Sequence, residues 1–456
     1  MTKRQLSLCL SVFAIGCATD EAPEDDLDLS ETEQAVTCPA PALRIDRSFA
    51  VTDPTILAKF SFQRVVTRIN TTAKSNITPL QLYKDWMATW SACSPGVDPN
   101  GYGIVCTRPE SQFGTINPFA TTGTRFAPVA LMNRFDLAPS NGADCGEYRI
   151  VYALKDRPDG DRAFIIFEAR LPNPNTALGL AGCAGVADFW AKLSTTADAA
   201  TRATQLERFY FTGITAEGLT FSPVVTAANY GLATTGTPTG KGQIRTNFFA
   251  DFNEWHLREF KMKKACAAAE TCKASVAQVT VKTNAAGELF RGTHARTAAF
   301  ETSFLNQVPA LSRRNAATLG MATQDAHNEW ESSAQGPEVV YRDFTRASFR
   351  TKIQAKITNP NLTVDNILDR ATTQTCGGCH QHSNGTPQLG DNVRWQPSLG
   401  FVHVDETSTL SPALNLVFLP RRQAVMKSFL DRQCTPGATQ PAADELTIGG
   451  AALDAH

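Results

Sequence analysis

The positions of the cysteines restrict how this chain can fold. Ten of the twelve cysteines lie beyond residue 37. Outside the cytosol, where disulfides persist, such a set predicts a framework of closed loops. Spacing suggests four pairs: Cys93 with Cys106, Cys145 with Cys183, Cys266 with Cys272, and Cys38 with Cys434. Two further cysteines, Cys376 and Cys379, remain, and parity does not decide their role because eight and ten are both even.

The N-terminus is typical of an export signal. Lys3 and Arg4 precede an apolar stretch, residues 6–16, that is too short to span a membrane. It ends at Ala14-Ile15-Gly16-Cys17, which resembles a bacterial lipobox, although that family prefers Leu where Ala14 stands. The resemblance implies a signal peptide at residues 1–17 and a lipid on Cys17. We therefore expect an exported protein, periplasmic or on the outer surface, anchored by this lipid to a bacterial membrane; ordinary secretion with cleavage nearby is the alternative.

The next segment, residues 18–37, predicts an acidic disordered tether. It holds eight acids and no base between Asp20 and Glu33, so it cannot form a core. Residues 1–36 carry two bases and eight acids, and without them the chain of 43 bases and 44 acids has a net charge of +5. Because this charge is mild and no basic cluster accompanies it, we expect no nucleic-acid partner.

The length of 456 residues predicts two domains, and residues 38–335 form the larger one in this interpretation. Asp53-Pro54 and Thr78-Pro79 each begin a predicted amphipathic helix, since a capping side chain precedes proline. Alternating strands at 147–154 and 163–171 flank the turn Arg157-Pro158-Asp159-Gly160 and predict an antiparallel hairpin. Further helices are expected at 186–193, 197–209 and 300–308, and further strands at 126–131, 243–249, 255–262 and 276–281. Helices and strands in separate runs favour an α+β fold around an antiparallel sheet.

Residues 332–337 are interpreted as a linker to a small all-α domain at 345–435, followed by a flexible tail at 436–456. Phe349, Ile353 and Ile357 share one helix face. Thr363 caps a second helix that leads directly into Cys376.

That helix is followed by Cys376-Gly377-Gly378-Cys379-His380, which has the C-x-x-C-H spacing of c-type haem attachment. In this chemistry two thiols bond to the porphyrin and the adjacent imidazole binds the iron. The motif predicts one covalent haem c held by Cys376, Cys379 and His380. We expect one ring nitrogen of His380 to bind iron while the other donates to a backbone carbonyl, and the two glycines to leave room for the macrocycle.

With this motif, residues 345–435 resemble the small class I type of c-type cytochrome domain. The order of a helix, the motif, the 381–419 loop and a helix from Pro420 matches that family, and Gly385-Thr386-Pro387-Gln388-Leu389 is similar to its turn after the motif. The family usually supplies a methionine from the loop as the sixth ligand, and this loop has none. His403 is therefore the expected sixth ligand, with Met426 as the alternative, and His382 lies too close to His380.

Other interpretations of the motif stay open. Cys376 and Cys379 can form a disulfide, and Cys376, Cys379, His380 and Cys434 have ligand types that zinc accepts. A thioredoxin-like role lacks the βαβ context. Outside the motif, His256 and His327 are interpreted as structural or surface residues. Trp395 and Arg394 could contact haem propionates but are interpreted as a core tryptophan beside a solvated arginine.

The sequence thus predicts an exported lipoprotein that transfers electrons through one haem, with a redox protein or a small electron donor or acceptor as partner. The alternatives are a periplasmic or cell-surface binding lipoprotein whose C-x-x-C is a disulfide, and a mono-haem oxidoreductase. Whether the protein is an enzyme is left open, and no catalytic residue is assigned.

Overall fold

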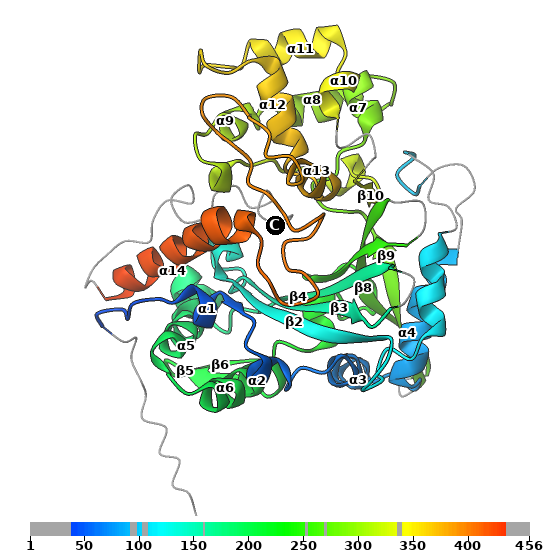
Figure 1. Cartoon of the computed structure of the whole chain (residues 1–456), viewed down its shortest axis with the longest axis vertical. Helices are drawn as coiled ribbons and strands as arrows, with labels where there is room; N and C mark the ends of the chain where they lie inside the picture. The colour runs from blue at the N-terminus through cyan, green and yellow to red at the C-terminus, as the bar shows by residue number, and fades with distance from the viewer. Residues whose placement is uncertain are drawn as a thin grey trace, which may run out of the picture. The chain divides into compact units, whose positions relative to one another are not determined.

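The computed structural model describes residues 38–91, 98–102, 108–157, 160–250, 254–268, 271–334 and 340–434 (Figure 1). Several predictions concern other parts of the chain: the signal peptide with Cys17, the acidic tether, the Cys93–Cys106 pair, the centre of the 157–160 turn and the tail at 436–456. They lie outside the described residues. In the described part, no helix is long and apolar enough to cross a membrane.

A large antiparallel sheet organises the fold. Eight of the described strands pair in the order β1-β2-β3-β4-β7-β8-β10, with β9 pairing β8 (Figure 1). The strands are β1 (Ala50–Val51), β2 (Arg125–Arg134), β3 (Glu147–Lys155), β4 (Arg162–Arg170), β7 (Gln243–Phe249), β8 (Trp255–Ala268), β9 (Thr271–Val279) and β10 (Ser332–Ser333). A separate hairpin pairs β5 (Ile214–Ala216) with β6 (Leu219–Phe221). The predicted fold with a large antiparallel sheet, including the β3–β4 hairpin, is confirmed.

Helices cover one face of this sheet. They are α1 (Ile45–Ser48), α2 (Pro54–Leu57), α3 (Phe62–Thr72), α4 (Pro79–Ala88), α5 (Ala184–Thr195) and α6 (Ala199–Phe211). Short 3₁₀ turns lie between elements: η1 (Thr89–Ser91), η2 (Pro109–Thr115), η3 (Phe135–Leu137), η4 (Thr176–Cys183) and η5 (Ala227–Tyr230). The single helix predicted from Asp53 is two helices, because Ser61 caps a new one by accepting from the Arg64 N–H. Thr78 caps α4 as expected.

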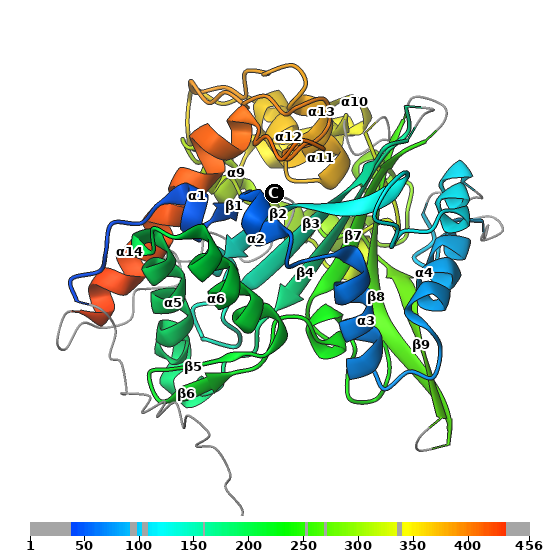
Figure 2. The ribbon, with the colours of Figure 1, turned by 60° about the horizontal axis from the view of Figure 1, so that its bottom comes forward.

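Aromatic side chains fill the space between these helices and the sheet. Tyr152 of β3 meets Phe62 of α3 at 5.0 Å between ring centroids, and Tyr148 of β3 stacks on Trp190 of α5 at 5.8 Å. Such pairs add to the free energy gained by burying apolar area. The alternation of large apolar residues along β3 therefore marks the face that these helices cover (Figure 2).

Residues 285–371 form a second, helical cluster with its own apolar core. Its helices are α7 (Gly287–Arg291), α8 (Thr297–Leu305), α9 (Val308–Leu311), α10 (Tyr341–Phe344), α11 (Ala347–Gln354) and α12 (Val364–Thr372), with turns η6 (Ala316–Thr318) and η7 (Asp325–His327). Phe290 stacks on Tyr341 at 4.0 Å at its centre. Thr363 and Asn366 form a capping box at the start of α12, which confirms the predicted cap.

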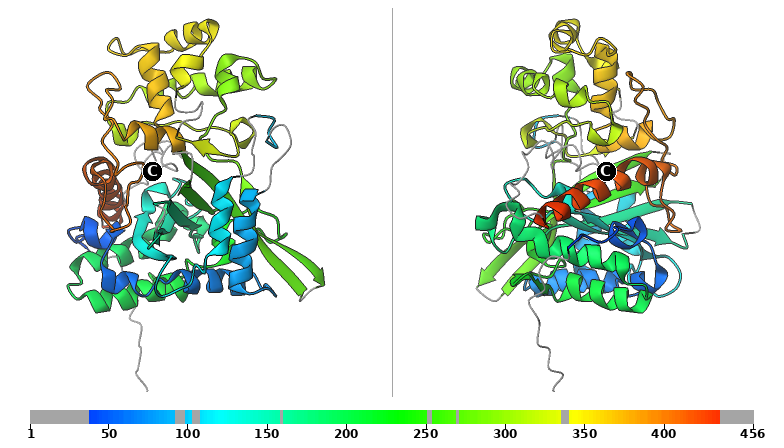
Figure 3. Two further views of the ribbon diagram at one scale, coloured as in Figure 1. Left: turned by 45° about the vertical axis from the view of Figure 1, so that its right-hand side comes forward. Right: turned by 90° about the vertical axis from the view of Figure 1, so that its left-hand side faces the viewer.

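The C-terminal segment begins on the other face of the sheet, and its last helix ends beside α5 and α1 (Figure 3). It contains α13 (Cys376–His382), a π-helical turn η9 (Leu414–Phe418) and α14 (Leu419–Gln433). Its apolar residues between Leu389 and Leu430 belong to the same core as the sheet. α12 packs in the helical cluster, whereas α14 packs on α5 and η3, so the small all-α domain expected at 345–435 is not confirmed.

The boundary expected near residues 332–337 does not separate two bodies. The described residues between 38 and 434 belong to one compact unit. Ser332 and Ser333 are not part of a linker but form strand β10, which pairs with β8 opposite Leu257 and His256. The reason is that β10 and α13 both contact β8, a feature that polar composition does not reveal.

Three of the predicted disulfides are confirmed: Cys38–Cys434, Cys145–Cys183 and Cys266–Cys272. The first joins the start of the described chain to the end of α14, so it holds the C-terminal segment beside α1. Cys376 and Cys379 are not joined in a disulfide.

Candidate functional site

Helix α13 brings the three motif side chains together. Thr375 caps the helix, because its hydroxyl accepts from the Gly378 N–H at 2.9 Å. Cys376, Cys379 and His380 stand at positions i, i+3 and i+4, which share one face of a helix. Both thiols are buried and reduced. Burial raises the pKa of the Cys376 thiol to about 12 and raises the pKa of the Cys379 thiol as well.

The two glycines of the motif serve the packing of α13. The Gly377 N–H donates to Ser332 Oγ at 2.8 Å, and a Cβ on Gly377 would lie 2.4 Å from the Ser333 carbonyl oxygen. A Cβ on Gly378 would lie 2.1 Å from the carbonyl oxygen of Thr372. The expectation that both glycines make room for a macrocycle is therefore wrong. They let α13 approach β10 and the preceding turn more closely than any side chain would allow.

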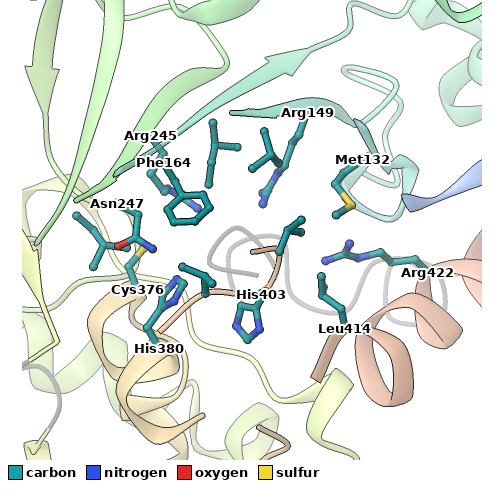
Figure 4. Close-up of a pocket in the computed structure, with 15 residues that line it drawn as sticks. Met132, Arg149, Phe164, Arg245, Asn247, Cys376, His380, His403, Leu414 and Arg422 are labelled. Carbon is teal, nitrogen blue, oxygen red and sulfur yellow. The ribbon is translucent and has the colours of Figure 1, made fainter. Parts of the chain in front are cut away.

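A cavity lies between the C-terminal segment and the sheet (Figure 4). The C-terminal wall is made by Cys376, His380, Val402, His403, Val404, Leu414 and Arg422. The sheet wall is made by Met132, Arg149, Val151, Phe164, Ile166, Arg245, Asn247 and Leu257.

His380 is oriented by the backbone. Its Nδ1 is hydrogen-bonded to the carbonyl oxygen of Phe401, as expected from the motif. A carbonyl only accepts, so Nδ1 carries the proton and Nε2 keeps a lone pair. Burial lowers the pKa of His380 to about 4. The side chain is therefore neutral at pH 7, which is the state in which an imidazole binds a metal.

His403 lies beside His380, with 5.2 Å between the ring centroids. Its Nδ1 is 3.0 Å from Ser411 Oγ, and its Nε2 is 3.5 Å from Cys379 Sγ. Burial lowers its pKa well below the ordinary value. The structure thus brings together all four residues that the sequence analysis placed nearest the haem: Cys376, Cys379, His380 and His403.

Cys379 does not line the cavity, and neither do three other candidates. Met426, the alternative ligand, is buried in α14 with its sulfur 3.6 Å from Asn133 Nδ2. Trp395 donates from Nε1 to Ser383 Oγ at 2.9 Å, and Arg394 bridges to Gln388 in the 388–394 turn. Trp395 is buried and Arg394 is exposed, as interpreted from the sequence.

Arginines are the cavity residues that the sequence analysis missed. Arg149 and Arg245 rise from the sheet, and Arg422 comes from α14 (Figure 4). Arg245 is 2.8 Å from a Glu259 oxygen and 3.3 Å from Glu168, and Arg149 is also 3.3 Å from Glu168. Guanidinium groups are always charged and only donate. The guanidinium groups of this buried charge network therefore face the cavity.

Burial raises the pKa of Glu168, against the opposing effect of Arg149 and Arg245. On the far side of the cavity, burial lowers the pKa of Arg422 well below its ordinary value. Asp136, the carboxylate near Arg422, is already held by Arg134 at 3.0 Å. The described residues lining the cavity include three arginines and no acid, so this site favours an anionic group.

Only Arg149 among these arginines could have been suspected from the sequence. Glu147 and Arg149 lie on the face of β3 opposite Tyr148 and Ile150, where a half-exposed strand has polar residues. Nothing in the pattern tells whether such a face meets water or a distant segment. Arg422 had no comparable signal, because its position on α14 is typical of a solvated helix.

His256 belongs to a separate polar cluster at the edge of the sheet. Its Nδ1 is 2.6 Å from a Glu331 oxygen and its Nε2 is 2.9 Å from a Glu254 oxygen. Hydrogen bonds to these carboxylates outweigh burial and raise the pKa of His256 to about 9. His327 is buried beside Phe300, and burial lowers its pKa. Neither residue lines the cavity.

The zinc interpretation is wrong, because Cys434 is bonded to Cys38. Among the described residues, no group of three or more His, Cys, Asp and Glu side chains is placed to hold a metal ion. Raised thiol pKa values also disfavour a thioredoxin-like role, which needs a thiolate at neutral pH.

Comparisons with known proteins gave no match. No protein-family model matches the chain, and no significant match was found among the curated proteins or the solved structures. The function must therefore be argued from the site itself.

Proposed function

We propose that this protein binds one haem covalently, through thioethers at Cys376 and Cys379 and with His380 as an axial ligand. One observation carries the proposal: both motif cysteines are reduced, and Cys376 and the neutral imidazole of His380 line a cavity beside α13. The class I cytochrome fold does not support it, because α12 and α14 belong to different apolar clusters.

The state of the thiols suits the attachment chemistry. Each thiol adds across a vinyl double bond, so that a sulfur–carbon bond forms and the proton goes to the neighbouring carbon. The addition needs reduced cysteines and no oxidant, and both cysteines are reduced and buried. His380 would offer Nε2 to the iron while Phe401 holds Nδ1. Such a group supplies one-electron transfer.

The walls of the cavity suit the rest of a haem. Apolar side chains from both walls, including Phe164, Val402 and Leu414, would contact the macrocycle. Arg149 and Arg422 lie on the side of the cavity away from Cys376 (Figure 4). A carboxylate accepts two parallel hydrogen bonds from a guanidinium, so these arginines are suited to the two propionates.

The cellular role follows from the sequence. A haem on an exported, lipid-anchored protein serves as an electron carrier for a redox protein or a small donor or acceptor, in the periplasm or at the outer surface. A mono-haem oxidoreductase is the enzyme that the same site permits. The confirmed disulfides are consistent with an oxidising compartment.

Haem staining on a denaturing gel tests the proposal, with the protein exported in a host that matures c-type cytochromes. The wild type is expected to stain and to give a c-type reduced-minus-oxidised spectrum. The C376S/C379S variant should lose the stain, whereas the control C266S/C272S, which removes the β8–β9 disulfide, should keep it. An unstained wild-type band would contradict the proposal.

A second function has its own support in the arginines of the cavity. An apolar small molecule with a carboxylate or phosphate group would be held there without covalent attachment, as in a binding lipoprotein. In that case calorimetry would show that the protein purified without haem binds such a ligand. Arg422→Met would weaken this binding, whereas C376S/C379S would leave the affinity unchanged.

A further inference from the structure

His380 and His403 lie on the same wall of the cavity. Both come from the C-terminal segment, and Figure 4 shows His403 directed away from the sheet. An iron between two imidazoles needs roughly 6 Å between ring centroids, given metal–nitrogen distances of about 2 Å. The observed separation is 5.2 Å. Both nitrogens of His403 are also directed at protein atoms, Ser411 Oγ and Cys379 Sγ.

The wall opposite His380 is the sheet. Its polar groups in the cavity are the guanidinium groups of Arg149 and Arg245 and the amide of Asn247. Guanidinium groups have no lone pair to give to iron. Met132 has a thioether, but Figure 4 places it beside Arg422, at the end of the cavity away from His380. Phe164 lies between these groups and contributes no donor.

We propose that the haem position opposite His380 is left open by the protein and takes a small anionic ligand, which Arg245 stabilises from the sheet. This inference rests on the proposed haem attachment. The guanidinium groups are fixed by Glu168 and Glu259 at 2.8–3.3 Å, so they are oriented before any ligand arrives.

Visible spectroscopy of the ferric, haem-loaded protein tests this inference, with cyanide as the probe. The spectrum is expected to be high-spin and to change to low-spin as cyanide binds. His403→Ala and Met132→Leu should leave the high-spin spectrum unchanged. Arg245→Lys, which keeps the charge but loses the fork of donors, should weaken cyanide binding by about tenfold or more.

Arg314→Lys is the matched control, because Arg314 is 75 % exposed and pairs with Asp391 away from the cavity. It should leave cyanide affinity unchanged. A low-spin spectrum in the wild type that becomes high-spin in His403→Ala or Met132→Leu would overturn the inference while leaving haem attachment intact. Equal cyanide affinity in Arg245→Lys and wild type would overturn the role of the arginine. Loss of the haem stain in the wild type would instead overturn the proposed function.

Discussion

The two faces of the central strands are buried in different ways. On β3, Tyr148 and Tyr152 pack directly against helices α3 and α5. On the other face, Glu147 and Arg149 are almost as well buried, but beneath the C-terminal segment and around a cavity. Apolar packing stabilises the first face. The second face carries buried charges, and only pairing between them offsets the cost of their desolvation. Buried charge networks of this kind are common at functional sites.

The largest expected effect comes from breaking the charge pairing. Arg245→Met leaves Glu168 and Glu259 without one of their partners, so the free energy of unfolding should fall by about 3–5 kcal/mol. Urea unfolding measures this change. Lys427→Met, which breaks the exposed pair with Asp431, is the control and should cost at most about 1 kcal/mol. Equal effects in both variants would mean that the buried network does not stabilise this face.

Ile165 and Ile166, adjacent on β4, allow the two faces of the sheet to be compared by the same substitution. Ile165 is fully buried on the helix-covered face, whereas Ile166 lines the cavity and is only partly buried. Ile165→Ala should lower the free energy of unfolding by about 2–5 kcal/mol, because it creates a cavity in a packed core. Ile166→Ala should cost less, since its side chain already borders open volume. A larger cost for Ile166→Ala would show that the cavity is packed in solution.

The smallest effect depends on pH and concerns His256. Its pKa is about 9 when folded and 6.5 as the model value, so the charged form is favoured by folding by about 3 kcal/mol. This contribution is fully present below pH 6.5 and is lost as the pH rises through about 9. The stability difference between wild type and His256→Gln should therefore shrink between pH 6 and pH 10. A difference that is constant over this range would contradict the assigned pairing with Glu254 and Glu331.

Much of the fold follows from local patterns. Thr78 and Thr363 cap their helices because their hydroxyls accept from backbone N–H groups three residues on. The β3–β4 hairpin follows from alternation, and Cys266–Cys272 from a short spacing on paired strands. The domain boundary was predicted wrongly, because polar composition near residue 332 does not reveal that Ser332 and Ser333 pair with β8.

The sequence by itself determined the candidate chemistry: Cys376, Cys379 and His380 share a helix face because their spacing is local and a helix repeats every 3.6 residues. Only the tertiary structure decided what that face meets. Arg149 and Arg245 come from strands, and Arg422 from the last helix, so their meeting around one cavity depends on contacts between segments 96 to 273 positions apart. Such contacts arise from packing of the whole chain, which no local pattern encodes.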